Sequence, residues 1–257
     1  MKGDPRLDAV RNDLREMGGV AICFSGGLDS TVLADLAFGE LGERAVAVVV
    51  DVPMMTLRQR KAAQAIADFI GIEMVKAPLD YGDLPDILEN THSRCYICKT
   101  AMYSAVRRKA EELGLPYVVN GEIVDDLSED RPGMRASEEN GIRRPFLDAG
   151  IGRDAIRYYI DSMDLPMTMV KDTCMLMRYP EGTPVTESDL RLAEDLEAEV
   201  REVTGIHQIR VRRKGDSFSV QTSTVEHDIL FGNLDAVGNV FTRRGLRFEA
   251  DPSGYDK

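Results

Sequence analysis

The hexapeptide Ser25-Gly26-Gly27-Leu28-Asp29-Ser30 lies between a short apolar run at 20–24 and a segment with helical apolar periodicity. Its adjacent glycines allow a tight turn and a close approach of the backbone to a ligand. A helix that begins after the turn would direct free N–H groups and the positive end of its dipole toward that ligand. The hydroxyls of Ser25, Ser30 and Thr31 add donors. The pattern predicts a phosphate- or pyrophosphate-binding loop, although such a turn can also be purely structural.

Three cysteines have the spacing or the setting of metal ligands. Cys95 and Cys98 are separated by two residues at the start of a predicted helix, where both thiolates could reach one metal and the helix N-terminus favours the thiolate form. The pair could equally be a redox dithiol, half of a zinc site, two iron–sulfur ligands or packing residues. With Cys174 as a third ligand, the set could hold a [4Fe-4S] cluster with one iron open. Zinc with His92 as its fourth ligand is the competing hypothesis, and Cys23, in a buried strand, is expected to belong to the core.

Two further groups have charges suited to a nucleotide or an acidic substrate. Asp51 ends the second apolar run, where it could contact the ribose or adenine or simply form a turn. Arg210 and Arg212 alternate along a predicted strand and so share one face. Their guanidinium groups suit a phosphate or a carboxylate, although with Arg213 and Lys214 they could instead form an exposed basic edge.

Length and composition limit the class of protein. The 257 residues suffice for one large domain, or for one domain and a small appendage. The net charge of −12 disfavours broad attraction to nucleic acid or to an anionic membrane. The sequence has no apolar run near the roughly 18 residues of a membrane helix and no signal-peptide pattern. A cytoplasmic enzyme is therefore expected, and its four cysteines are too few for a secreted disulfide scaffold.

Strands are predicted at 20–24, 45–50, 73–78 and 116–121, the first two of them buried, with helices at 8–18, 31–41, 57–70, 95–113 and 152–163. This alternation predicts an α/β fold with a doubly wound parallel sheet over residues 1–181. Ligands of such sheets bind at the carboxyl ends of the strands, so the hexapeptide and Asp51 should face one crevice. The polar segment 122–141 is predicted to be a functional loop in which Asp125, Asp126 and Arg131 line the opposite wall or are simply solvated. A short strand-like piece is predicted at 145–147.

A division of the chain is predicted near Gly182. Residues 182–257 are expected to form a small α+β domain, with helices at 186–203 and 224–240 and strands at 208–211, 217–222 and 246–249.

The hexapeptide resembles the S-G-G-x-D-S signature of the PP-loop ATP pyrophosphatases, which cleave ATP between the α and β phosphates and adenylate a substrate oxygen. Nearly the whole chain is similar to the LarE family of ATP-dependent sulfur transferases. The matching segments, in order, are Arg94-Cys95-Tyr96-x-Cys98-Lys99, Asp125-Asp126, Arg131-Pro132-Gly133, Cys174 to Arg178, Gly182-Thr183-Pro184-Val185-Thr186, Arg210-Val211-Arg212 and Gly254-Tyr255.

The resemblance implies that ATP and Mg²⁺ bind at the hexapeptide, where Asp29 orients the loop or holds the metal. ATP would adenylate a carboxylate of a pyridinium biscarboxylate mononucleotide, and sulfur would then displace AMP, as in nickel-pincer nucleotide cofactor biosynthesis. Some members take the sulfur from a cysteine that matches Cys174. Others bind a [4Fe-4S] cluster through three cysteines and use a sulfide source, and Cys95, Cys98 and Cys174 fit this second type. The resemblance also implies a homo-oligomer.

The chain departs from the family at two places. Met177 stands where the family often has serine, which makes the sacrificial-cysteine route less favourable, and the chain ends Gly254-Tyr255-Asp256-Lys257 where the family often reads Gly-Tyr-Arg, so the substrate could differ. The alternatives are a tRNA-thiolating PP-loop enzyme, an ammonia-using amide synthetase and a non-catalytic nucleotide- or zinc-binding regulator. The acidic net charge argues against the first alternative, and the three cysteines argue against the second.

Overall fold

The computed structural model describes residues 4–79, 85–128, 132–166 and 172–255. They divide into two compact units. The first unit takes its residues from 1–52, 57–87 and 93–170, and the second from 53–56, 88–92 and 171–257. The predicted functional division near Gly182 stays a prediction. No helix in the described ranges is both long enough and apolar enough to cross a membrane.

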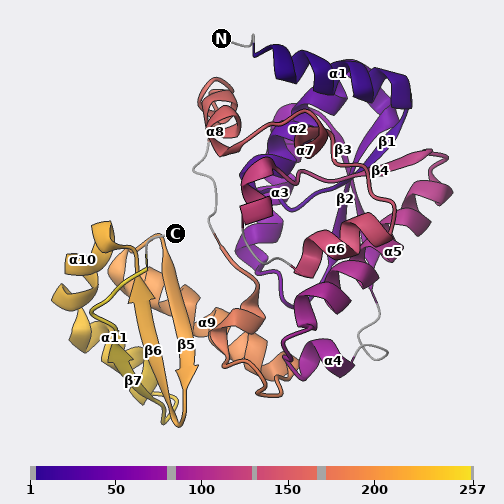
Figure 1. Cartoon of the computed structure of the whole chain (residues 1–257). Coiled ribbons are helices and arrows are strands. Elements are labelled where there is room, and N and C mark those ends of the chain that lie inside the picture. The colour runs from indigo at the N-terminus through magenta and orange to yellow at the C-terminus, as the bar shows by residue number, and fades with distance from the viewer. Residues whose placement is uncertain (1–3, 80–84, 129–131, 167–171, 256–257) are drawn as a thin grey trace. The chain divides into compact units, whose positions relative to one another are not determined.

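The first unit is built on a parallel sheet of four strands in the order β3-β2-β1-β4 (Figure 1). This confirms the predicted α/β fold. The strands are β1 (Val20–Cys23), β2 (Ala45–Asp51), β3 (Glu73–Pro78) and β4 (Tyr117–Val119). The helices are α1 (Pro5–Met17), α2 (Leu28–Leu41), η1 (Gly42–Arg44), α3 (Leu57–Ile70), α5 (Arg94–Glu112), η2 (Val124–Ser128), α6 (Pro132–Glu139), α7 (Pro145–Asp148) and α8 (Arg153–Asp161); the short α4 (Pro85–Leu88) lies where the two units meet in sequence.

The order of the strands determines where a ligand would bind. The chain runs outward from β1 through β2 to β3, and then returns to place β4 on the other side of β1. Right-handed crossovers therefore place α2 and α3 on one face of the sheet and α5 on the other. The switch point lies between β1 and β4, and ligands of open parallel sheets bind there, outside the carboxyl ends of the strands. The apolar run of β2, buried from Ala45 to Val50, anchors this sheet in the core.

Two predictions for the first unit were wrong. Residues 145–147 form the helix α7 instead of a strand-like piece, because Pro145 occupies the first helical position, which has no need of an N–H donor. The predicted loop at 122–141 contains η2 and α6. Helix α6 forms because one of its faces is buried, with Ala136 and Ser137 fully inaccessible.

The second unit is the predicted small α+β fold. Strands β5 (Ile209–Lys214) and β6 (Ser217–Thr222) are antiparallel, and β7 (Arg247–Ala250) joins β6 in parallel (Figure 1). The helices are η3 (Met175–Arg178), α9 (Glu187–Thr204), η4 (Thr224–Glu226), α10 (His227–Gly232) and α11 (Leu234–Thr242), so the single helix predicted at 224–240 is interrupted. Helix α9 begins with a capping box between Thr186 and Asp189. Residues of α9, α10, α11 and the sheet share one apolar core.

Candidate functional site

The predicted phosphate loop has the backbone geometry that its glycines allow. Strand β1 leads through a tight turn into α2, with Gly27 as the N-cap residue and no side-chain cap. Gly26 has a φ of +71°, in the left-handed region that favours glycine. A Cβ atom on Gly26 would lie 2.8 Å from the Cα atom of Ala63 in α3. The glycine is therefore required both for the turn and for the packing of the loop against α3.

Serine hydroxyls hold the shape of this loop. Ser30 Oγ donates to the carbonyl of Gly27 at 3.1 Å and lies 3.2 Å from Ser25 Oγ. It also accepts from the backbone N–H of Ser25 at 3.3 Å, while Ser25 Oγ accepts from the N–H of Gly27. Asp29 lies in the first turn of α2 and is half-buried. An uncapped helix N-terminus next to a glycine turn is a suitable environment for an anion such as a phosphate.

The end of β4 touches this same loop. A Cβ atom on Gly121 would lie 2.9 Å from the carbonyl carbon of Asp29 and 3.1 Å from the backbone nitrogen of Ser30. The segment that follows β4 therefore packs closely against the first turn of α2, the helix that follows β1. Gly121 is not among the residues predicted from the sequence, although a glycine directly after a buried strand is a signal of close approach.

Behind the contact lies a buried polar cluster that the sequence analysis also missed. The carboxylate of Glu122 accepts from Ser137 Oγ at 2.7 Å and from the hydroxyl of Tyr103 at 3.4 Å. Lys99 Nζ lies 3.9 Å from Glu122 Oε1 and 3.4 Å from the Tyr103 oxygen, and Asn120 donates to that oxygen at 3.0 Å. Burial raises the pKa of Tyr103 above its usual value, so the hydroxyl stays protonated and can donate.

The thiol of Cys23 lies at the end of β1, close to the same charges. Burial raises its pKa to about 12, with Lys99 lowering and Glu122 raising the value to a smaller extent. The thiol is therefore protonated at neutral pH and is a poor nucleophile and metal ligand. By accessible surface, however, the residue as a whole is half-buried, so its assignment to the core stays a prediction.

Three acidic residues that the sequence suggests for the site, Asp51, Asp125 and Asp126, take part in local interactions. Asp51 ends β2 as predicted and lies 3.3 Å from Arg60 Nη1, while Arg60 Nη2 donates to the carbonyl of Val52. Asp125 accepts from the N–H of Arg153 at 2.8 Å, at the start of α8. Asp126 accepts from the N–H of Ile123 at 3.1 Å, at the start of η2. Asp125 and Asp126 thus have structural contacts, and Arg131 lies outside the described residues.

Cys95 and Cys98 lie in the first turns of α5, at neighbouring positions of one helix face. Cys95 is exposed, and Cys98 is half-buried with its sulfur 3.7 Å from that of Met102. They belong to the first unit and Cys174 to the second. Within the described ranges, no group of three or more His, Cys, Asp or Glu residues is placed to hold a metal ion. The [4Fe-4S] cluster and the zinc alternative both remain predictions; His92, in the second unit, is exposed and lies 3.2 Å from Glu181.

Cys174 lies in a loop whose two sides are joined by hydrogen bonds from one arginine, Arg178. The residue is exposed and serves as the N-cap of η3. Arg178 is 1% exposed, and its guanidinium donates to Thr173 Oγ1 at 2.7 Å, to Asp172 Oδ1 at 2.6 Å and to Glu197 at 2.6 and 3.3 Å. Burial acts to lower the pKa of Arg178, but Glu197 and Asp172 outweigh this and raise it. The bonds on both sides of Cys174 fix the loop and leave the thiol accessible.

Arg210 and Arg212 share one face of the second sheet, as predicted. Burial lowers the pKa of both guanidinium groups, and the charge of Arg178 lowers each further. The Nε atoms of both are buried without a hydrogen-bond partner in the described part of the chain. Tyr255 lies against Arg210, with the guanidinium carbon 3.8 Å from the ring centre. Closely spaced, incompletely paired guanidinium groups favour the binding of an anion.

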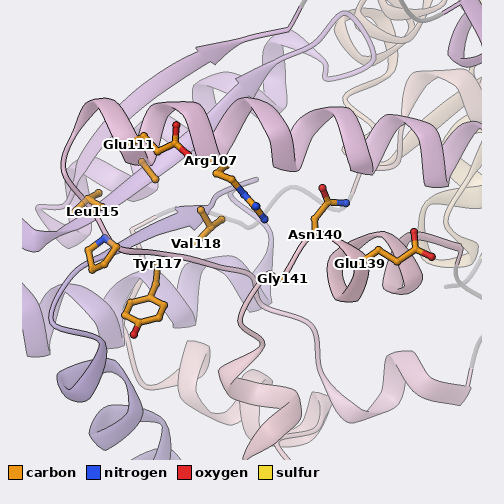
Figure 2. A pocket seen from close by; sticks show the side chains of 10 residues that line it. Arg107, Glu111, Leu115, Tyr117, Val118, Glu139, Asn140 and Gly141 are labelled. Carbon is orange, nitrogen blue, oxygen red and sulfur yellow. The ribbon is translucent and has the colours of Figure 1, made fainter.

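The first unit also contains a hollow of about 450 Å³ that none of the predicted site residues lines. Figure 2 shows Arg107, Tyr117, Glu139 and Asn140 around it. Its residues come from the end of α5, the start of β4 and the end of α6. The hollow therefore lies near the amino end of β4, whereas the nucleotide loop and Gly121 lie at the carboxyl ends of the strands.

Comparison with known proteins places this site in a family. A model of the asparagine synthase family matches residues 7–107, which include the loop. An uncharacterized protein of Synechocystis is 31% identical over 210 residues, which are 81% of this chain and 78% of that protein. The pyridinium-3,5-bisthiocarboxylic acid mononucleotide synthase of Lactiplantibacillus plantarum is 28% identical over 238 residues, or 91% of this chain and 86% of the synthase. One of the polypeptides of the glutamine-hydrolyzing GMP synthase of Archaeoglobus fulgidus is 25% identical over 51% of this chain and 46% of that polypeptide.

The strand, glycine turn and helix at the switch point indicate the same family as these matches do. The chain belongs to the PP-loop family of ATP-using enzymes, and within it the chain is similar to the LarE-like proteins.

Proposed function

We propose that this protein is an ATP-dependent sulfur transferase that replaces a carboxylate oxygen by sulfur in a pyridinium biscarboxylate mononucleotide or a close analogue. Such a reaction belongs to nickel-pincer nucleotide cofactor biosynthesis. The observation that carries the proposal is the similarity to the Lactiplantibacillus synthase over 91% of the chain, which includes both the nucleotide loop and the Cys174 loop. The arginines beside that loop support it, because they suit a substrate with a phosphate and carboxylates.

The roles of the residues follow from their positions in the two units. ATP with Mg²⁺ lies on the Ser25–Ser30 loop, where Gly26 and Gly27 permit the turn and Asp29 orients it or holds the metal. Asp51, at the end of β2, contacts the ribose or adenine. The substrate carboxylate attacks the α phosphorus, and pyrophosphate leaves. A sulfur nucleophile then attacks the adenylated carbonyl carbon, AMP leaves, and no redox change is needed when the donor is sulfide.

Residues of both units are assigned to the substrate and to the sulfur donor in this proposal. Arg210 and Arg212 hold the substrate phosphate or the second carboxylate, and Arg131 adds a further cation from the first unit. We propose that Cys95, Cys98 and Cys174 bind a [4Fe-4S] cluster, which would supply an open iron able to carry an extra sulfide. The alternative is that Cys174 donates its own sulfur. A homo-oligomer, a sulfide source and a cytoplasmic location complete the proposal.

The test is a set of four cysteine variants, prepared without oxygen and assayed with ATP, sulfide and the biscarboxylate mononucleotide. We expect about four iron and four acid-labile sulfide atoms per chain, and loss of thiocarboxylate in Cys95→Ala, Cys98→Ala and Cys174→Ala, with ATP binding retained. Cys23→Ala is the matched control, because its thiol is buried and protonated. If Cys174 alone is essential and no iron is present, the cluster is absent and the cysteine is the donor. If no variant affects thiocarboxylate formation, the proposal fails.

An ammonia-using synthetase is the second candidate, because the matching family model is that of asparagine synthase and GMP synthases are among the relatives. That enzyme would form an amide from the same adenylate. Replacing sulfide by ammonium chloride in the assay distinguishes the two candidates, since only the synthetase would then yield a carboxamide.

A further inference from the structure

Glu122 is a buried carboxylate next to the nucleotide loop, and the proposed function gives it no role. Its side chain is 8% exposed. It directly follows Gly121, where an added Cβ atom would lie only 2.9–3.1 Å from backbone atoms of Asp29 and Ser30. Burying an ionised carboxylate is costly unless donors and a cation compensate for the lost water. Ser137, Tyr103 and Lys99 provide this compensation at 2.7, 3.4 and 3.9 Å.

The cation of this cluster is held loosely. Charge-assisted N–H···O bonds are usually about 2.7–2.9 Å long, whereas Lys99 Nζ lies 3.4 Å from the Tyr103 oxygen and 3.9 Å from Glu122. The Lys99 side chain is also 46% exposed, although Glu122 is buried. An ammonium group has three donors. The lysine is therefore tethered by the carboxylate, and it keeps the capacity to bind a stronger anion from solution.

The direction of the lysine is also determined by its surroundings. A Cβ atom on Gly133 in α6 would lie 3.1 Å from both Cδ and Cε of Lys99, so α6 packs closely along the lysine stem. The electrostatic influence of Lys99 and Glu122 on the pKa of Cys23 places both charges near the end of β1, the strand that leads into the nucleotide loop. Lys99 also follows Cys98 directly on α5.

We propose that Glu122, with Tyr103 and Ser137, is a positioning group that holds the Lys99 ammonium for a phosphate of the nucleotide bound at the Ser25–Ser30 loop. This inference rests on the ATP use in the proposed function and adds two residues to it. Lys99 contacts the nucleotide, and Glu122 acts only through Lys99. An exposed lysine without the tether would lose more side-chain entropy on binding, so the tether makes phosphate binding tighter.

The test measures binding of α,β-methylene-ATP and of adenosine by calorimetry, with Mg²⁺ present. Lys99→Met should weaken binding of the analogue about tenfold or more, as loss of a hydrogen bond to a charged group predicts. Binding of adenosine, which lacks phosphates, should not change. Glu122→Gln should weaken binding of the analogue several-fold. The double variant should bind no more weakly than Lys99→Met alone, because a residue that acts through another has no effect once that residue is gone.

Matched controls and a milder variant separate this role from a structural one. Arg108→Met on α5 and Glu138→Gln on α6 remove exposed charges from the same helices and should leave binding unchanged. Ser137→Ala removes the 2.7 Å contact with Glu122, together with a 2.8 Å contact with the carbonyl of Met134 in the same helix, and so tests the tether if Glu122→Gln does not fold. The inference is overturned, while the proposed function stands, if Lys99→Met binds the analogue normally. It is also overturned if Glu122→Gln and Ser137→Ala weaken analogue binding as much in the Lys99→Met protein as in the unaltered protein. If the unaltered protein does not bind the analogue, the proposed function itself fails.

Discussion

The substitution Gly121→Ala tests whether backbone contact between β4 and α2 shapes the nucleotide loop. Gly121 is not required for its own backbone angles, since it is not among the glycines with positive φ. A side chain at position 121 is excluded because there is no space for it. The new Cβ atom would lie 2.9 Å from the carbonyl carbon of Asp29, whereas ordinary contacts begin at 3.4 Å. The atoms that it meets are backbone atoms, which cannot move away as a flexible side chain does.

The size of the effect follows from this shortfall of about 0.5 Å. Overpacking of this kind costs about 1–3 kcal/mol of stability. The displaced atoms belong to the first turn of α2, whose N–H groups form the predicted phosphate site. Because a misplacement of about 1 Å in a catalytic site costs about a hundredfold in rate, we expect a loss of about tenfold in kcat/KM for ATP.

The assay combines thermal unfolding with ATP-dependent release of pyrophosphate. Gly39→Ala is the matched control, because Gly39 lies within α2 and a Cβ atom there would meet no other atom within 4 Å. That change should raise stability by about 0.5–1 kcal/mol, since alanine is the better helix former, and should not affect ATP use. If Gly121→Ala and Gly39→Ala have the same kcat/KM for ATP, the contact does not shape the loop and the reasoning is refuted.

Two further predictions concern the second unit. Arg178→Met should lower its free energy of unfolding by about 3–5 kcal/mol, because Glu197 is fully buried and loses its closest cation; urea titration measures the loss, and the double variant with Glu197→Leu should regain part of it. Glu226→Gln tests pH dependence. Burial raises the pKa of Glu226, but the N–H groups of His207 and Gln208 outweigh this and lower it below 4.5. The ionised carboxylate of Glu226 stabilises the folded state at neutral pH, and this stabilisation disappears as the pH falls through the folded pKa. Below about pH 4.5 the unaltered protein should therefore lose more stability with acid than the variant. Parallel curves of stability against pH for the two proteins would contradict this.

Local sequence patterns were sufficient for the scaffold. The runs at 20–24 and 45–50 are apolar, and the second is rich in Val, as buried parallel strands are. The segment 73–78 carries Glu73 and Lys76, and its strand β3 lies at the edge of the sheet, where Ala77 is its one buried residue. The nucleotide loop followed from its glycines. Its boundary was misplaced, because helix α2 begins at Leu28 instead of 31. Asp29 and Ser30 are polar residues that the pattern assigns to a turn, yet they are also favourable in the first turn of a helix.

Other features depend on contacts between distant parts of the chain. Helix α6 was predicted as a loop, because its Pro-Gly start and charged residues are typical of loops, and its buried face becomes visible only when α5 is placed beside it. Glu122 and Lys99 were read as residues of a polar segment and of a cysteine motif. Their interaction spans 23 positions in sequence, and no periodicity relates them. The ligand roles of Cys95, Cys98, Cys174, Arg210 and Arg212 stay predictions for the same reason, because each depends on a bound molecule.

Buried charges in this protein differ in how fully they are paired, and that difference separates structural from functional groups. All three nitrogen atoms of the Arg178 guanidinium donate to Glu197, Asp172 or Thr173 at 2.6–3.3 Å. A group so fully paired has no capacity for a ligand, and its replacement should affect folding first. Among the residues that the structure describes, Lys99 has long polar contacts of 3.4 and 3.9 Å and is half-exposed, although its partner Glu122 is buried. Burying a carboxylate to hold a cation in such an incomplete arrangement contributes little stability, which supports our proposal that an anion completes the arrangement when it binds.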